Sequence, residues 1–133
     1  MASVSELDVQ GSEEANKALV RRFIDEFKNG CRLDSVDELC SPGFVMHGAE
    51  TRGPNDLKEF RSMIAKAHPN ARGHVDDLLA DGDRVVERST WRAPRTGETD
   101  SKPVRWWEIH IYRIENGKIA ELWSQADTPR PDD

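Results

Sequence analysis

The sequence predicts an α+β fold in which three N-terminal helices pack on a strongly curved antiparallel β-sheet. The chain has 133 residues, the size of one ordinary domain. Apolar residues recur at helical spacing in its first half, and the period changes to two in its second half. Helices followed by an antiparallel meander are typical of a domain whose helices cover one face of the sheet. We expect a single domain at residues 12–127, with flexible termini at 1–11 and 128–133.

The helical half contains three predicted helices. The first runs from a cap at Ser12 to a stop at Gly30. A shorter helix is predicted over 34–39, with Asp34 as its cap, and Gly53 and Pro54 begin a third that closes at His68. The apolar stripe of the first helix consists of Leu19, Val20, Phe23, Ile24 and Phe27.

The second half has the alternation of β-strands, and one short strand is also expected between the second and third helices. Turn residues at 81–83 and 115–117 predict tight hairpins between consecutive strands. The strand candidates are Phe44–His47, Gly73–Leu79, Arg84–Arg92, Val104–Ile114 and Lys118–Ala126.

Composition and charge exclude several classes of function. The chain is 36% hydrophobic and 33% charged, and no apolar run approaches the roughly 20 residues that a membrane span needs. A net charge of −6 opposes binding to nucleic acid. The polar, acidic residues of Met1–Gln10 are unlike a secretory signal, and Cys31 and Cys40 lack disulfide or metal-ligand patterns. We therefore expect a cytoplasmic protein with free thiols.

Several segments follow one another in a characteristic order along the chain: Asn16–Phe23, Leu33–Leu39, Gly53–Phe60, Gly82–Arg88, Ile109–Trp123 and Asp127. Together they resemble SnoaL-like polyketide cyclases of the NTF2-like superfamily, over roughly residues 16–127. The resemblance implies a cone-shaped fold around one pocket for a small hydrophobic or polycyclic molecule. It also implies frequent dimerisation through the outer sheet face, and neither a metal nor an organic cofactor.

The resemblance also indicates a catalytic histidine on the strand 104–114. Alternation places Trp106, Glu108, His110 and Tyr112 on one face of that strand, which we interpret as the pocket face. The histidine of the family corresponds to His110, whose ordinary pKa of about 6.5 makes both protonation states accessible. The family's catalytic aspartate would follow on the last strand, where this chain has Ser124, a poor general base without activation.

Two carboxylates are candidates to replace the missing aspartate. Glu108 lies two positions from His110 on the same face, and a half-buried carboxylate there is expected to have a raised pKa. Alternatively, Glu108 pairs with Arg88 or Arg92. Asp127 matches a frequent family aspartate, but strict alternation directs it away from the pocket unless a bulge intervenes.

Five further positions are predicted to contact the ligand: His47, Trp91, Trp106, Tyr112 and Ser124. His47 lies where related sequences often carry a polar pocket residue, although a capping or surface role is the alternative. The two tryptophans offer flat apolar area for stacking, and ordinary packing is the alternative for them. No histidine or cysteine pair has ligand spacing, so no metal site is predicted.

These residues favour a cofactor-independent cyclase or isomerase that acts by aldol-type acid/base chemistry on a polyketide-like or polycyclic carbonyl compound. A noncatalytic ligand-binding protein is the alternative, because Ser124 replaces the aspartate. An epoxide hydrolase is a third hypothesis, but the expected Asp-Arg-Asp arrangement is not evident. A homodimer is predicted through the outer sheet face, where Trp107, Ile109 and Ile111 would otherwise be exposed.

Overall fold

A computed structural model describes residues 4–94 and 102–132, with side chains described from residue 12 onward. Its helical elements are α1 (Val4–Arg22), the π-helix η1 (Phe23–Asn29), α2 (Ser35–Leu39) and α3 (Gly53–Ala67). The strands are β1 (Cys40–His47), β2 (Thr51–Arg52), β3 (Arg72–Asp81), β4 (Arg84–Ala93), β5 (Val104–Glu115), β6 (Lys118–Ala126) and β7 (Arg130–Pro131).

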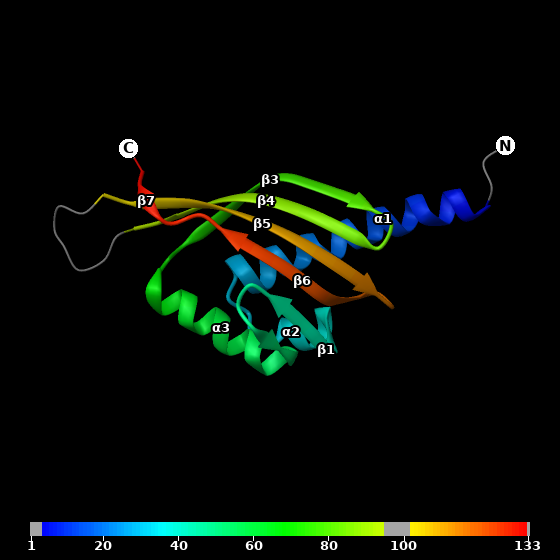
Figure 1. The fold of residues 1–133 in the computed structure, drawn as a ribbon, viewed down its shortest axis with the longest axis horizontal. Helices are drawn as coiled ribbons and strands as arrows, with labels where there is room; N and C mark the ends of the chain where they lie inside the picture. The colour runs from blue at the N-terminus through cyan, green and yellow to red at the C-terminus, as the bar shows by residue number, and fades with distance from the viewer. Residues whose placement is uncertain (1–3, 95–101, 133) are drawn as a thin grey trace.

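The strands form one curved sheet with the helices on one of its faces (Figure 1). The order along the sheet is β2-β1-β6-β5-β4-β3, and β7 adds to β5. This arrangement confirms the predicted α+β fold. One strand pair departs from the antiparallel prediction, because β1 runs parallel to β6. Tight turns join β3 to β4 and β5 to β6. In contrast, β1 enters the sheet from the helical layer, and a long crossover permits its parallel pairing with β6.

The first helix differs from its prediction at both ends. It begins at Val4, so Ser12 lies inside α1 rather than at its cap. The helical segment continues beyond Arg22 as the π-helix η1 and ends at Gly30, the stop that the sequence predicted. A Cβ at Gly30 would lie 2.7 Å from the carbonyl oxygen of Glu26, which explains the glycine. The predicted domain limits and flexible termini stay predictions; residues 1–3 and 133 lie outside the described residues.

The second and third helices begin near their predicted positions. Asp34 occupies the N-cap position of α2, but its side chain makes no capping hydrogen bond. In α3, Pro54 lies in the first turn, where its missing N–H costs nothing. Two short strands were not predicted, β2 and β7, because two residues carry no detectable alternation.

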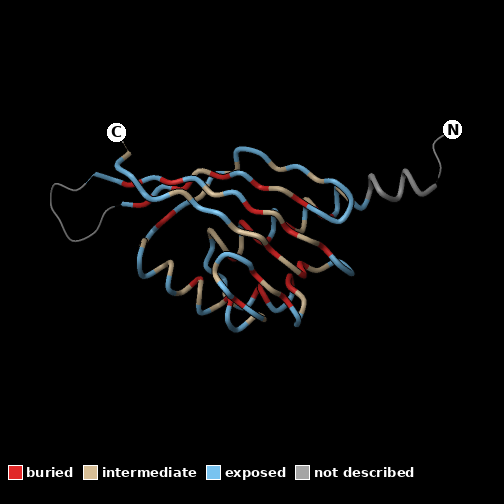
Figure 2. Tube along the Cα trace, viewed as in Figure 1, coloured by how far each residue is buried: buried red, intermediate tan, exposed pale blue. Residues whose placement is uncertain are grey.

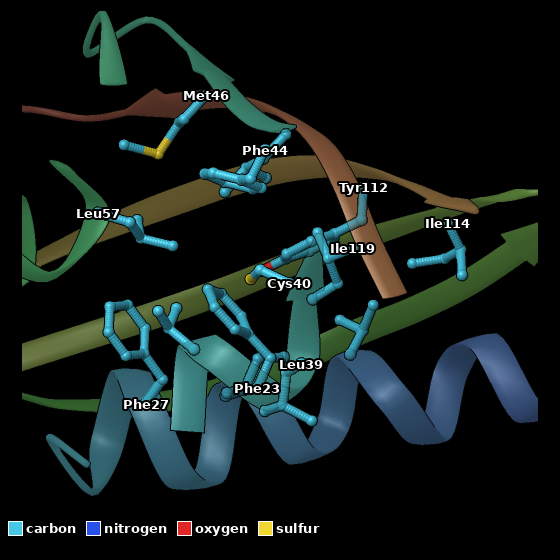
Figure 3. Close-up of a cluster of buried hydrophobic side chains, with 14 of the residues drawn as sticks. Phe23, Phe27, Leu39, Cys40, Phe44, Met46, Leu57, Tyr112, Ile114 and Ile119 are labelled. Carbon is cyan, nitrogen blue, oxygen red and sulfur yellow. The ribbon is translucent and has the colours of Figure 1, made fainter. Parts of the chain in front are cut away.

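The core lies between the helical layer and the inner face of the sheet (Figures 2 and 3). Buried residues alternate along β4 and β5, as expected for a sheet with one covered face. On β5, Tyr112 is fully buried while Trp107 is 42% exposed and Ile109 38% exposed. The predicted two faces of this strand are therefore present. The side chains that contribute most to the cluster include Phe23, Phe27, Leu39, Phe44, Leu57 and Ile119.

Candidate active site

A cavity of about 240 Å³ lies between η1, α3 and the inner face of the sheet. It is larger than the roughly 150 Å³ cavity that holds benzene in another protein. It is smaller than the roughly 300–1,000 Å³ of many drug-sized ligand pockets. One or two fused rings are therefore the size of ligand that suits it. Much of the wall is apolar, with side chains that include Phe27, Met46, Leu57, Phe60, Ile64 and Leu122.

Six of the eight residues predicted from the sequence lie on the wall of this cavity. They are Trp91, Trp106, Glu108, His110, Ser124 and Asp127. They converge because β4, β5 and β6 are neighbours and pair in a register that sets Trp91 opposite Trp106 and His110 opposite Ser124. What each residue does there stays a prediction.

The other two predicted ligand contacts do not line the cavity. His47 is exposed at the end of β1, where its Nε2 lies 2.6 Å from Glu121 and its ring stacks on Trp123. Tyr112 lies on the correct face of β5 but is completely buried beneath the cavity, and its hydroxyl donates a hydrogen bond to Glu87. Alternation predicted the face of Tyr112 correctly, but not its depth in the core.

Glu108 is surrounded by donors. Its Oε1 accepts a hydrogen bond from His110 Nε2 at 2.7 Å, and its Oε2 accepts one from Trp106 Nε1 at 2.8 Å. Lys28 Nζ from η1 lies 3.5 Å from Oε1. Burial by itself would raise the pKa of Glu108, but Lys28 and the hydrogen bonds outweigh it and lower the pKa to about 2. The predicted raised pKa is therefore wrong.

The predicted arginine partners of Glu108 are engaged elsewhere. Arg88 projects from the outer face of β4 and lies 2.7 Å from Asp77. Arg92 lies 2.9 Å from Asp132. The cation beside Glu108 is instead Lys28, which comes from the helical layer. The alternation of residues along a strand gives no information about a partner from another layer.

His110 is held by Glu108 on one side only. Because ionised Glu108 accepts the Nε2 proton, the neutral ring has its lone pair on Nδ1. Nδ1 is buried and makes no hydrogen bond to any residue that the structure describes. An imidazole with one nitrogen anchored to a carboxylate and the other unengaged is suited to accept and return a proton.

A second buried carboxylate, Glu87, lies opposite His110 on the neighbouring strand and shares Lys28 with Glu108. It lies on β4 with none of its side chain exposed, and Lys28 Nζ is 3.2 Å from its Oε2. The hydroxyls of Ser89 and Tyr112 both donate to Glu87. Burial would raise the pKa of Glu87, but Lys28, His110 and these hydroxyls lower it below its usual range. Lys28 thus bridges two carboxylates.

Sequence reasoning missed both Lys28 and Glu87. The signal for Glu87 was available, because it lies between Val85 and Ser89 at an inward-facing position of an alternating strand. A glutamate at such a position needs a buried partner. Lys28 follows Phe27 near the end of a helix and resembles an ordinary surface lysine, so the sequence carried no comparable signal for it.

Asp127 reaches the cavity just after the end of β6. Its backbone N–H donates to the carbonyl of Trp107 at 2.9 Å, and its carboxylate pairs with Arg130 and accepts from the Thr128 N–H. Asp127 also lines a hollow on the outer face of the sheet with Trp107 and Ile109, so it lies at the edge between the two faces. Unlike Glu108, Asp127 makes neither a hydrogen bond nor an ion pair with His110.

The two cavity tryptophans lie in an aromatic stack. Trp91 and Trp106 have ring centroids 6.2 Å apart with near-parallel planes, and the His68 ring is 4.7 Å from Trp106. Gly73 lies opposite Trp91 on β3, where an added Cβ would be 2.3 Å from the indole. The absence of a side chain at Gly73 is therefore what allows Trp91 to lie flat against β3.

The chain thus has an α+β fold with a partly open, largely apolar cavity and a histidine on the cavity wall. Residues 18–129 match the family model of the SnoaL-like polyketide cyclases, and the chain belongs to this family. No curated protein sequence matches the chain significantly.

Solved structures share the fold at low sequence identity. A SnoaL-like polyketide cyclase from Agrobacterium tumefaciens strain C58 is 18% identical, with a TM-score of 0.70 over 82% of this chain and 88% of the other. IdmH from Streptomyces antibioticus, assigned as a polyketide cyclase, is 20% identical, with a TM-score of 0.75 over 84% and 91%. AclR from Streptomyces galilaeus, assigned as a hydroxylase, is 24% identical, with a TM-score of 0.74 over 86% and 80%.

Two further observations bear on partners of the protein. Among the described residues, no three His, Cys, Asp or Glu side chains are grouped so that they could hold a metal ion. None of the described helices is both long and apolar enough to cross a membrane.

Proposed function

We propose that this protein is a cofactor-independent cyclase or isomerase for a polyketide-like or polycyclic carbonyl compound, with His110 as the group that moves the proton. The observation that carries the proposal is the 2.7 Å contact between His110 Nε2 and Glu108 Oε1 on the wall of a largely apolar cavity. An oriented imidazole in such a site is suited to general acid/base catalysis.

The proposed reaction is an aldol-type ring closure with one proton moved twice. His110 Nδ1 removes a proton from the carbon beside a carbonyl, which leaves an enolate; because Nδ1 is buried in this structure, ligand binding must first turn it toward the cavity. The enolate carbon forms a bond to a second carbonyl carbon of the same molecule, whose oxygen becomes an alkoxide. The imidazolium of His110 then returns the proton to this alkoxide, so no oxidant or reductant is needed. An isomerisation uses the same two transfers at two carbon atoms.

Glu108 takes a different role from the one predicted. A carboxylate with a pKa of about 2 is a weak base at neutral pH. Its place beside His110 Nε2 suits it to hold the ring in one tautomer and to stabilise the imidazolium that forms during the reaction. Glu108 is thus a positioning residue for His110 in this proposal.

The test measures the first proton transfer alone. The bicyclic ketone 2-tetralone is incubated with the protein in D₂O, and loss of the signal of the hydrogens beside the carbonyl is followed by NMR. The protein is expected to accelerate exchange above the buffer rate. His110→Asn should lower the protein-dependent rate by roughly 10²-fold or more. Glu108→Gln should lower it by about tenfold or more and change its pH profile.

A matched control is available outside the cavity. His47 and Glu121 form a second histidine–glutamate pair at 2.6 Å on the surface. Glu121→Gln should leave the exchange rate unchanged. Asp127→Asn separates the two rival carboxylates: a large loss of rate in this variant, with little loss in Glu108→Gln, would reverse the assignment.

A noncatalytic ligand-binding function is the second candidate. Ser124 occupies the position where the family has its aspartate, and Nδ1 of His110 has almost no accessible surface. Under this alternative, 2-tetralone binds in the cavity without faster exchange. The His110 and Glu108 variants then have the same exchange rate as buffer and as the unaltered protein.

We also propose that the protein forms a homodimer through the outer face of the sheet. Trp107 and Ile109 are exposed there beside each other on β5. Two large apolar side chains on an open sheet face are a common feature of protein interfaces. A two-fold dimer would cover both copies of this patch at once.

A further inference from the structure

Arg61 of α3 is a buried cation on the wall of the cavity. Only 7% of the residue is exposed, and it is the one arginine among the described cavity-lining residues. An arginine is almost never this deeply buried unless its charge has a partner. The partners of Arg61 therefore decide what this side chain does.

The guanidinium of Arg61 is only partly engaged. Its Nε donates to the carbonyl oxygens of Phe27 at 3.3 Å and Lys28 at 3.1 Å. Its Nη2 donates to the Lys28 carbonyl and lies 3.0 Å from Cys31 Sγ. These contacts satisfy carbonyls at the C-terminal end of η1, where the helix carries a partial negative charge. No described residue accepts a hydrogen bond from Nη1.

Arg61 also lacks an oppositely charged partner, whereas Lys28 and Asp127 on the same wall each have one. Lys28 lies beside Glu87 and Glu108, and Asp127 pairs with Arg130. No described carboxylate lies within 4.0 Å of Arg61. The partial charge of a helix end is about half an elementary charge, so it offsets the guanidinium incompletely.

We propose that Arg61 binds an anionic oxygen of the ligand, so that the ligand class is an aromatic or polycyclic carboxylate. A carboxylate on the ligand would supply the missing counter-charge and accept hydrogen bonds from Nη1. The apolar part of the ligand would then fill the cavity toward Trp91 and Trp106. This inference shares the cavity with the proposed function but requires no catalysis.

The experiment compares two probes that differ only in charge. The anion 2-naphthoate and its neutral methyl ester are titrated into the protein, and binding is followed by calorimetry and by quenching of tryptophan fluorescence. A hydrogen bond to a charged group corresponds to roughly 10- to 100-fold in affinity. The unaltered protein is therefore expected to bind 2-naphthoate at least about tenfold more tightly than the ester.

The variant Arg61→Gln should lower the affinity for 2-naphthoate by about tenfold or more and change that for the ester by less than about twofold. Arg72→Gln is the matched control, because Arg72 is an exposed arginine that donates to Asn29 O at the same end of η1 and does not line the cavity. It should leave both affinities unchanged. The comparison of probes in the unaltered protein keeps the test decisive if Arg61→Gln does not fold.

Three outcomes would overturn the inference. Equal binding of the two probes, or tighter binding of the ester, contradicts an anion site and leaves the proposed catalysis standing. An equal loss for both probes in Arg61→Gln assigns Arg61 to structure alone. Binding of neither probe removes the cavity as a ligand site and contradicts the proposed function as well.

Discussion

Replacing Glu108 with glutamine removes one charge from the buried network while it keeps the shape of the side chain. Lys28 retains Glu87 as its partner at 3.2 Å. Trp106 Nε1 and His110 Nε2 donate to different oxygens of Glu108, so in the variant one of them keeps an amide oxygen as acceptor and the other faces the amide NH₂. The lost hydrogen bond lowers the stability at every pH, so the part of the stability difference that changes with pH reports on the carboxylate charge.

The size of the effect follows from the pKa of Glu108. In the folded protein this pKa is about 2, against an ordinary value of 4.5. The difference corresponds to about 3 kcal/mol of stability at pH 7. Because the folded pKa is the lower one, the contribution is complete above about pH 5 and is lost as the pH falls toward 2. By pH 3, about 2 kcal/mol of it has gone.

Urea unfolding at pH 7, 5, 4 and 3 measures this contribution directly. The unaltered protein should be more stable than Glu108→Gln at pH 7, and the gap should close by about 2 kcal/mol at pH 3. Glu59→Gln, at an exposed position of α3, is the control and should lie within about 0.5 kcal/mol of the unaltered protein at pH 7. A gap of the same size at all four pH values would refute the argument.

Two further predictions concern the same strand. Tyr112 is the only tyrosine of the chain, and burial, reinforced by the negative charge of Glu87, raises its pKa well above the ordinary value. The stability that the protonated hydroxyl contributes is fully present below about pH 10 and is lost as the pH rises through the folded pKa. The absorbance at 295 nm should therefore stay flat past pH 10 until the protein unfolds. A titration near pH 10 in the folded protein would contradict this. On the other face, the double variant Trp107→Ser/Ile109→Ser should convert a micromolar dimer to a monomer in sedimentation experiments, and an unaltered protein that sediments as a monomer would exclude the dimer.

The strands were predictable because their alternation reflects one covered sheet face. The predicted strand 118–126 agrees with β6 at both ends, and β4 extends one residue beyond its predicted end at Arg92. The parallel pairing of β1 with β6 was not predictable in this way. Alternation indicates which face of a strand is buried but carries no information on the direction of its neighbour.

The candidate site was predictable only on the sheet. A period of two is sufficient to gather Trp106, Glu108 and His110 on one face of β5. The charges that set the behaviour of Glu108 come from other elements, above all Lys28 on η1. Residues 80 positions apart meet only through packing of the helical layer, so their pKa effects were outside the reach of local patterns. The sign of the predicted pKa change was wrong for this reason.

The π-helical turn of η1 ties the electrostatics of the cavity to the length of the chain. In a π-helix each amide donates to the carbonyl five residues earlier, so the turn holds one residue more than an α-helical turn. If residues 23–29 wound as an α-helix without losing a residue, Lys28 would be rotated by about 100° around the helix axis. Lys28 would then turn away from Glu87 and Glu108, and Arg61 would lose the carbonyl that fixes it. A relative with one residue fewer in this segment could present the same lysine to the cavity from an ordinary α-helix.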